Sequence, residues 1–428
     1  MTATATQTPP PAAPRVSGGK SGRFRLTFPV ILLIVSAGLI IVSAVRAITS
    51  ANDITSSGQI AGALAGAVPI GLAGLGGLWA ERSGVVNIGL EGMMILGTFF
   101  GAWAGWQTNP WLGVLAGVLG GAAGGLLHAI VTVTFGVDHI ISGVAINILA
   151  AGVTAYLAKR WFNVGKAAQL GGSPKQSPPM GDIKSFTVPG LSNWLISVEK
   201  HHWFLVSDIA GIIAGLVTDI SALTLLAIVL FIATFFVLWR TSFGLRLRSC
   251  GENPIAAESL GVNVYLYKYI AVTVSGALAG LGGVFLAIGT HFYLAGQTGG
   301  RGYIGLAAMI FGNWRPGGLA MGAGLFGYAD SLQLRNGSDS VHALLLLLAL
   351  LLLGMAVWKF LRKAYVAAAI AMTFAVLLAL WYLLTDTVPD EVVQATPYVA
   401  TLLVMGLSAQ RLRMPKADGI PYRKGQGG

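Results

Sequence analysis

Residues 221–239 read SALTLLAIVLFIATFFVLW and carry no charge, whereas residues 248–264 read RSCGENPIAAESLGVNV and are polar. An apolar run of about 20 residues is long enough to cross the hydrocarbon core of a bilayer as a helix. The polar run cannot lie in that core, because unpaired polar groups are costly there. The two stretches together predict a membrane-spanning helix followed by a polar segment that folds outside the membrane.

The composition of the whole chain agrees with this interpretation. Of its 428 residues, 55% are hydrophobic and only 10% are charged, and the mean hydropathy is +0.74. A soluble domain carries about 25% charged residues, so the sequence predicts an all-α polytopic membrane protein. The single cysteine, Cys250, excludes an intramolecular disulfide and a cysteine metal cluster, and we interpret it as a passive thiol.

Apolar runs of spanning length recur along the chain, and we expect about 10–12 transmembrane helices. The runs lie near 27–48, 59–79, 88–106, 110–134, 139–158, 221–239, 266–290, 317–334, 341–358, 364–384 and 393–409, with a shorter piece at 303–313. The expected organisation is a disordered cytoplasmic tail at 1–26, a transmembrane domain at 27–411 and a second cytoplasmic tail at 412–428. Within the domain we expect a long outer loop at 159–202 and a cytoplasmic loop at 244–265.

Basic side chains orient these helices. Lysine and arginine residues accumulate in the segments 15–25, 240–248, 359–363 and 411–424. Cytoplasmic connections carry such an excess, so both termini and the polar segment 248–264 are expected in the cytoplasm of a multi-pass cell-membrane protein. The net charge of +11 therefore reflects membrane topology and not a nucleic-acid-binding surface.

Two short motifs recur in opposite halves of the chain. LAGLGG occupies 72–77 and 278–283, and IGLEGMMILG at 88–97 is echoed by IGLAAMIFG at 304–312. The two copies enter the membrane from opposite sides in the expected topology, which is the pattern of an inverted repeat with the substrate path between its halves. Chance similarity between glycine-rich segments is the alternative. Glycines at every fourth position from Gly113 to Gly125 predict close helix packing.

Polar side chains inside the apolar runs are candidates for function. Glu91 and Asp330 are carboxylates within expected spans, where they mark either a functional site or a buried hydrogen-bond partner. Both interpretations of Glu91 stay open. Asn87 lies one helical turn before Glu91 and would share its face. For His128 and Asn147, helix–helix packing is the preferred interpretation.

The sequence contains no familiar catalytic or nucleotide-binding motif. It has no G-x-x-x-x-G-K-[ST] loop for ATP, no H-E-x-x-H and no G-x-S-x-G. It therefore favours a protein that is not an enzyme and binds no cofactor itself. His201 and His202 lack a third ligand for a metal. Glu81 and Arg82, at a span boundary, are interpreted as solvated residues.

The polar segment has the signals of a short helix. Pro254 suits a first helical turn, and Gly261 suits the residue just after a helix. We therefore expect a helix from Asn253 to Gly261. A rigid polar knob of this kind can transmit the movement of a separate motor protein into the flanking spans, whereas a flexible loop cannot.

The same residues resemble a known family. GENPIAAESLGVN, at 251–263, is similar to the coupling loop of ABC importer permeases of the ribose, nucleoside and branched-chain amino acid group. ERSGVVNIGLEGMM, at 81–94, is similar to permeases of nucleoside and simple-sugar importers, and GRGYIGLAAMIFGNWRPGG at 300–318 and GIPYRKG at 419–425 fit the same group. Two extra spans at about 341–384 depart from the family pattern.

The resemblance implies the membrane subunit of an ABC importer that translocates nucleosides by alternating access. Its implied partners are an ATP-binding subunit, a second homologous permease, an external substrate-binding lipoprotein and membrane lipid, with no nucleic acid. It assigns coupling to the ATPase to Asn253, Pro254, Ala256, Ala257, Glu258 and Gly261. The candidate residues of the translocation pathway are Asn87, Glu91, Asn147, Phe292, Tyr293 and Arg301.

Other functions remain open on the sequence alone. The cargo can be ribose or another simple sugar, and an ion-coupled secondary transporter would differ in depending on an ion gradient. A nucleoside needs a surface for a flat base. Four aromatic residues can either stack on that base or serve in packing, namely Phe99, Trp103, Phe292 and Tyr293. A structural membrane protein is disfavoured by the polar segment 248–264 and by Glu91.

Overall fold

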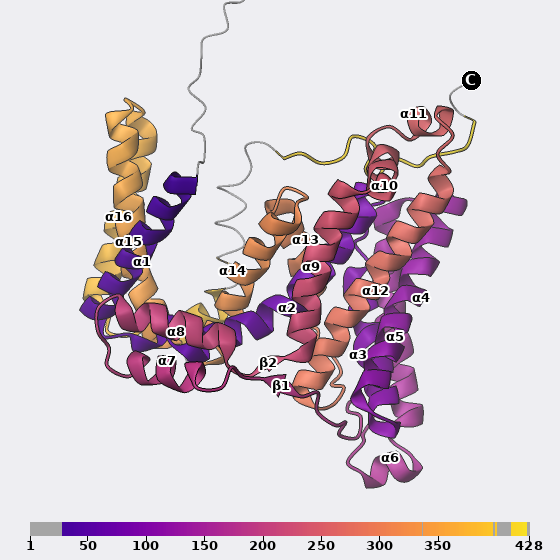
Figure 1. Ribbon diagram of the computed structural model, residues 1–428, viewed down its shortest axis with the longest axis horizontal. Helices are drawn as coiled ribbons and strands as arrows, with labels where there is room; N and C mark the ends of the chain where they lie inside the picture. The colour runs from indigo at the N-terminus through magenta and orange to yellow at the C-terminus, as the bar shows by residue number, and fades with distance from the viewer. Residues whose placement is uncertain (1–27, 336, 397–398, 400–411, 426–428) are drawn as a thin grey trace, which may run out of the picture.

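The computed structural model describes residues 28–335, 337–396, 399 and 412–425. Helices dominate these residues (Figure 1), and their one sheet pairs β1 (Ser185–Phe186) antiparallel with β2 (Ile220–Ser221). Seven of the described helices are long and apolar enough to cross a membrane, so the all-α prediction is confirmed. The tail expected at 1–26 and most of the span expected at 393–409 lie outside the described residues.

Six helices form a central body in which each half of the chain packs on the other. They are α2 (Ser57–Arg82), α3 (Leu90–Gln107), α4 (Pro110–Ala129), α12 (Val264–Thr290), α13 (Arg301–Phe311) and α14 (Pro316–Leu334). Helices α2 and α12 pack against each other, α3 and α4 pack on α12, and α13 and α14 pack on α2. The two LAGLGG copies lie on α2 and α12, so this reciprocal packing agrees with the predicted inverted repeat.

Glycines allow the closest helix contacts in this body. A Cβ added at Gly280 of α12 would lie 2.6 Å from the Gly117 carbonyl oxygen and 2.9 Å from the Gly121 Cα of α4. A Cβ at Gly276 would lie 2.8 Å from the Gly125 Cα. Real side chains do not tolerate such distances, so the packing role predicted for the glycines of residues 113–125 is confirmed.

Seven further α-helices surround or extend this body. They are α1 (Phe28–Thr49), α5 (His139–Trp161), α9 (Ala222–Arg240), α10 (Ser242–Glu252), α11 (Pro254–Ser259), α15 (Ser338–Leu361) and α16 (Tyr365–Leu384), with a π-helical turn η2 (Ile130–Thr134) before α5. Helix α5 packs on α3, and α9 lies against α2 and α14. Figure 1 shows α1, α15 and α16 standing together beside the body, so the two extra spans form a separate appendage.

The expected outer loop at 159–202 contains only short helices, as its proline and glycine content suggested. They are α6 (Gly165–Gln169) and α7 (Leu191–Glu199). Sequence reasoning missed the next helix, α8 (Val206–Val217), because its apolar run is too short to span a membrane. Helix α8 packs against α2 and beside α7, so α7 is attached to the central body through α8.

Candidate functional site

Two helices of the central body begin inside it. Helix α3 follows the irregular segment 83–89, in which Ser83, Val85 and Asn87 are fully buried, and α13 follows the segment 291–300. The Asn87 side chain holds the first segment, because its Oδ1 accepts the Gly89 N–H at 3.0 Å and its Nδ2 donates to Ser275 Oγ of α12 at 2.8 Å. Discontinuous helices of this kind form the substrate and ion sites of many transporters.

Glu91 connects the start of α3 to the start of α13. Its buried carboxylate accepts backbone N–H hydrogen bonds from Gly300 at 2.9 Å and from Gly302 at 2.7 Å. N–H groups at a helix start have no intrahelical acceptor, and the helix dipole favours a negative charge there. The contact is close, since a Cβ added at Gly302 would lie 2.6 Å from the Glu91 Cα. This geometry favours a role for Glu91 in positioning the two half-helices.

Asn147 of α5 completes this junction. Its Oδ1 accepts the Gly92 N–H at 2.7 Å, and its Nδ2 donates to the Ile88 carbonyl at 3.0 Å and to the Tyr303 hydroxyl at 2.9 Å. These three hydrogen bonds join α5 to α3, to the segment before it and to α13, which favours the packing interpretation of Asn147. His128 also serves packing, because its ring nitrogens contact Ser142 Oγ and the Val86 carbonyl oxygen.

A polar cavity of about 210 Å³ adjoins the start of α13. Arg301 Nη2 forms an ion pair with Asp330 Oδ2 of α14 at 2.6 Å, and both side chains are 20% exposed. The other lining residues are Ile70, Gly299, Ile304, Phe326, Gln333 and Leu334. The structure thus brings Arg301 together with the second intramembrane carboxylate of the sequence. Charged donors and acceptors at a cavity wall suit a ligand that carries hydroxyl and amide groups.

The aromatic candidates lie on α3, as Phe99 and Trp103, and in the segment 291–300, as Phe292 and Tyr293. Tyr293 is buried, and its ring centroid lies 5.4 Å from that of Phe99 in an edge-on arrangement. Trp103 joins the cluster through Trp161, whose ring lies 5.1 Å from it and 5.7 Å from Phe99. Phe292 is partly buried beside them in sequence. These contacts account for Phe99 and Tyr293 as packing residues, and on α3 Phe99 lies two helical turns from Glu91.

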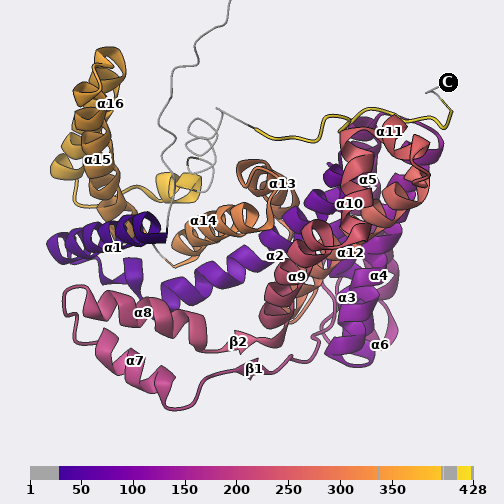
Figure 2. The same cartoon turned by 45° about the horizontal axis from the view of Figure 1, so that its top comes forward.

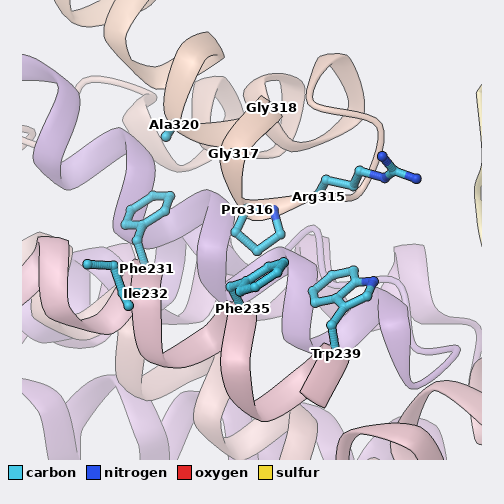
Figure 3. Close-up of a pocket in the computed structure, with 9 residues that line it drawn as sticks. All are labelled: Phe231, Ile232, Phe235, Trp239, Arg315, Pro316, Gly317, Gly318 and Ala320. Carbon is cyan, nitrogen blue, oxygen red and sulfur yellow. The ribbon is translucent and has the colours of Figure 1, made fainter. Parts of the chain in front are cut away.

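A second, apolar groove of about 630 Å³ lies between α9 and the start of α14 (Figure 3). Phe231, Phe235 and Trp239 form its wall on α9 and face Pro316, with Arg315 at one end. This groove offers few hydrogen-bonding groups, so its chemistry suits apolar chains and not a polar solute.

The short helix expected at 253–261 is α11. The Asn253 side chain accepts the Ala256 N–H at 3.0 Å as an N-cap, Pro254 is the first helical residue, and Gly261 adopts φ +81° after the helix. The predicted caps are confirmed, although sequence reasoning missed the preceding helix α10. Figures 1 and 2 show α10 and α11 together at one end of the molecule, where Leu260 is 84% exposed.

Beneath α10 lies a cluster of buried charges that sequence reasoning did not find. The interpretation of Glu81 as a solvated residue is wrong, because Glu81 is 4% exposed and accepts a hydrogen bond from Trp314 Nε1. Lys268 is also buried and donates to the Gly84 carbonyl at 3.3 Å. Asp418, from the C-terminal segment, lies beside both charges. Nothing in the local sequence near Asp418 signals its burial.

No metal centre accompanies these groups in the described ranges, where no three His, Cys, Asp or Glu side chains are placed to hold an ion.

Comparison with known proteins then identifies the architecture. Residues 59–356 match the model of the branched-chain amino acid transport system permease component. The chain belongs to this permease family.

The permease is similar to transporter subunits along most of its length. It is 35% identical to the guanosine ABC transporter permease protein NupQ of Bacillus subtilis, over 84% of this chain and 94% of NupQ. It is 33% identical to the nucleoside ABC transporter permease protein NupC of Lactococcus lactis, over 85% of this chain and 96% of NupC. The putative glucose ABC transporter permease protein TsgC13 of Haloferax volcanii is 34% identical, over 63% of this chain and 75% of TsgC13.

No solved structure matches the permease. The family and the seven apolar helices together make it a multi-pass membrane protein and a permease component of an ABC transporter.

Proposed function

We propose that the permease is the membrane-spanning subunit of an ATP-driven importer of nucleosides. The observation that carries this proposal is the similarity to NupQ and NupC, which extends over more than nine-tenths of each relative. Glucose or another simple sugar is the second candidate cargo, because TsgC13 is nearly as similar in sequence over a shorter stretch.

The chain itself performs no catalysis in this scheme. The end that carries α10 and α11 faces the cytoplasm and meets a separate ATP-binding subunit, which hydrolyses ATP. The six coupling residues belong to α11 and its caps, where the exposed side chains of Ile255 and Leu260 offer an apolar contact for that subunit. The exposed apolar face of α5, including Ile148 and Tyr156, is available to a second permease or to lipid. An external binding protein delivers the substrate at the opposite end.

The substrate passes near the junction of the two half-helices. We place Arg301 and Asp330 in contact with the polar groups of the nucleoside, because they line the cavity at the start of α13. Asn87, Glu91 and Asn147 act on backbone groups of α3 and α13 and therefore position those helices. Alternating access would then involve movement at this junction.

The test is uptake of radiolabelled guanosine, adenosine and uridine by cells with and without the gene, in competition with excess ribose or glucose. Parallel samples are depleted of ATP or have the proton gradient collapsed. Gene-dependent uptake that requires ATP, survives loss of the gradient and ignores the sugars is the expected result. Suppression by a sugar would change the cargo, and loss of uptake with the gradient while ATP is held would overturn the class.

A further inference from the structure

The C-terminal residues 412–425, here called the strap, cross the end of the molecule that carries α10 and α11 (Figures 1 and 2). The Arg413 N–H donates to Asn313 Oδ1 in the turn between α13 and α14, at 2.6 Å. Farther along, the Ala417 N–H donates to the Gly251 carbonyl near the end of α10, at 2.9 Å. The strap therefore bridges the turn between α13 and α14 and the helical knob formed by α10 and α11.

Tyr422 anchors the strap in the knob. Its side chain is 8% exposed and packs in a cluster with Cys250 of α10 and Ala257 of α11. Its ring centroid lies 5.7 Å from that of Tyr265 at the start of α12. One strap residue thus touches three helices that meet at the knob.

The strap also contacts α11 through Glu258. The Tyr422 hydroxyl interacts with the Glu258 carboxylate, and the Gly425 N–H lies 3.4 Å from Glu258 Oε2. Helix α11 has only six residues, and a helix of this length is not stable by its own hydrogen bonds. Of these six residues only Ala257 is buried, and it belongs to the same hydrophobic cluster as Tyr422. The contacts with the strap therefore add to those that α11 makes with α10 and α12.

Asp418 joins the strap to the central body. It is 8% exposed and lies beside Glu81 at the end of α2 and Lys268 in α12. The backbone is equally close, because a Cβ added at Gly84 would lie 3.2 Å from the Ala417 carbonyl oxygen. The knob, the strap and the segment that precedes α3 form one continuous contact.

We propose that the strap is a positioning element of the coupling machinery, which clamps α10 and α11 to α2, α12 and the α13–α14 turn. This inference rests on the proposed function, in which α11 meets the ATP-binding subunit. When the strap is docked, movement of α11 is transmitted to α3 and α13, the two helices that begin inside the central body. When the strap is released, α11 moves alone. The strap and α11 together form the face on which the ATP-binding subunit docks.

Cys250 reports on strap docking, because it is the only cysteine of the chain and is fully buried in the same hydrophobic cluster as Tyr422. Burial raises the pKa of its thiol to about 11, which slows its reaction with maleimides further. In the assembled transporter, Tyr422→Ala is expected to increase the rate of Cys250 labelling at least about tenfold. Tyr422→Phe keeps the ring and should label as slowly as the wild type. Unchanged labelling in Tyr422→Ala and in a chain that ends at residue 411 would overturn the docking claim.

The functional test is the number of guanosine molecules transported per ATP hydrolysed, measured in vesicles that contain the permease, its ATP-binding subunit and its binding protein. Tyr422→Ala should lower this ratio several-fold while ATP hydrolysis continues and the KM for guanosine stays the same. Tyr422→Phe should retain most of the ratio. If Tyr422→Ala lowered only the amount of permease in the vesicles, Tyr422 would have a merely structural role. An unchanged transport ratio in a variant with exposed Cys250 would overturn the inference.

These outcomes differ from a failure of the proposed function. If Gly261→Arg in α11 leaves guanosine transport normal, the assignment of α11 to coupling fails, whatever the strap variants do. If Gly261→Arg abolishes transport and the strap variants do not alter the transport ratio, coupling through α11 stands and the role of the strap is refuted.

Discussion

At the scale of single residues, the polar side chains of the buried junction act on backbone groups. Glu91, Asn87 and Asn147 each satisfy N–H groups at the start of α3 or α13. A half-helix that begins inside the protein exposes such groups away from water, and leaving them unpaired is costly. The cost of burying these polar residues is therefore offset by the helix starts that they stabilise.

We predict that Glu91→Gln destabilises the permease by about 1–3 kcal/mol and impairs uptake, because a carboxamide offers one oxygen where two N–H groups need acceptors. Thermal unfolding in detergent and guanosine uptake at matched protein level are the measurements. Glu391→Gln, at an exposed position, is the control. Wild-type stability and kinetics in Glu91→Gln would show that the carboxylate contributes neither to packing nor to transport.

Asp418 predicts a pH dependence of strap docking. Burial raises the pKa of Asp418 to about 7, although the neighbouring Glu81, Arg82 and Lys268 act in the opposite direction. Since the docked carboxyl group binds its proton more tightly than a free one, docking is strongest at low pH and weakens as the pH rises towards about 7. Labelling of Cys250 should thus be faster at pH 8 than at pH 6, beyond the effect of pH on thiol ionisation.

The effect of pH on thiol ionisation is measured in Tyr422→Ala, in which Cys250 is expected to be exposed at both pH values. This effect is used to correct the labelling rates of the wild type. Asp418→Asn cannot ionise at this position, so the remaining difference between pH 6 and pH 8 should disappear in this variant. An unchanged pH dependence in Asp418→Asn would assign the effect to another group.

At the scale of secondary-structure elements, glycine spacing decides how closely helices approach. Gly280 and Gly289 lie on the same helix, α12, but only Gly280 faces α4 at backbone contact; nothing lies within 4 Å of a Cβ added at Gly289. We predict that Gly280→Ala costs about 1–3 kcal/mol of stability through overpacking. Gly289→Ala should be neutral or stabilising by up to about 1 kcal/mol. Thermal unfolding of the two variants side by side checks this, and equal effects would contradict the packing geometry.

Gly261 is predicted to be a sensitive position of the proposed coupling element, α11. It adopts φ +81° with open space around it, so a larger side chain fits sterically but strains the backbone by about 1–2 kcal/mol. Gly261→Arg also places a charge beside Leu260 and should abolish uptake without affecting membrane insertion. Gly261→Asn, which tolerates this conformation, should retain uptake. Normal uptake by a correctly inserted Gly261→Arg variant would remove α11 from the coupling mechanism.

At the scale of the whole molecule, a buried ion pair ties the appendage of α1, α15 and α16 to the body. Arg46 Nε of α1 lies 2.7 Å from Asp208 Oδ1 of α8, and both side chains are almost fully buried. We predict that Arg46→Met costs about 3–5 kcal/mol, because it leaves the Asp208 charge unpaired. The double variant Arg46→Met with Asp208→Asn should recover most of that loss in thermal unfolding. A double variant no more stable than Arg46→Met would mean that Asp208 is not penalised by its charge.

Much of the architecture could be predicted because the information is local. Run length and hydropathy identify spans, and the caps at Asn253, Pro254 and Gly261 identify α11, since each signal depends on a few neighbouring residues. The motif repeated on α2 and α12 indicated an inverted repeat, and the reciprocal packing of the two halves agrees with it. Helices α8 and α10 were missed because the first is too short for a span and the second is too polar.

The sequence by itself determined that this chain is a helical membrane protein with a short polar helix outside its apolar spans, since those properties follow from composition, periodicity and capping residues, and the resemblance of its motifs indicated the permease family. Only the tertiary structure decided which polar residues meet. Glu91 accepts a hydrogen bond from Gly300, 209 residues later at the start of α13, and the strap brings Asp418 beside Glu81. Such partners depend on how the helices pack in three dimensions, and no local pattern in the chain encodes that long-range contact.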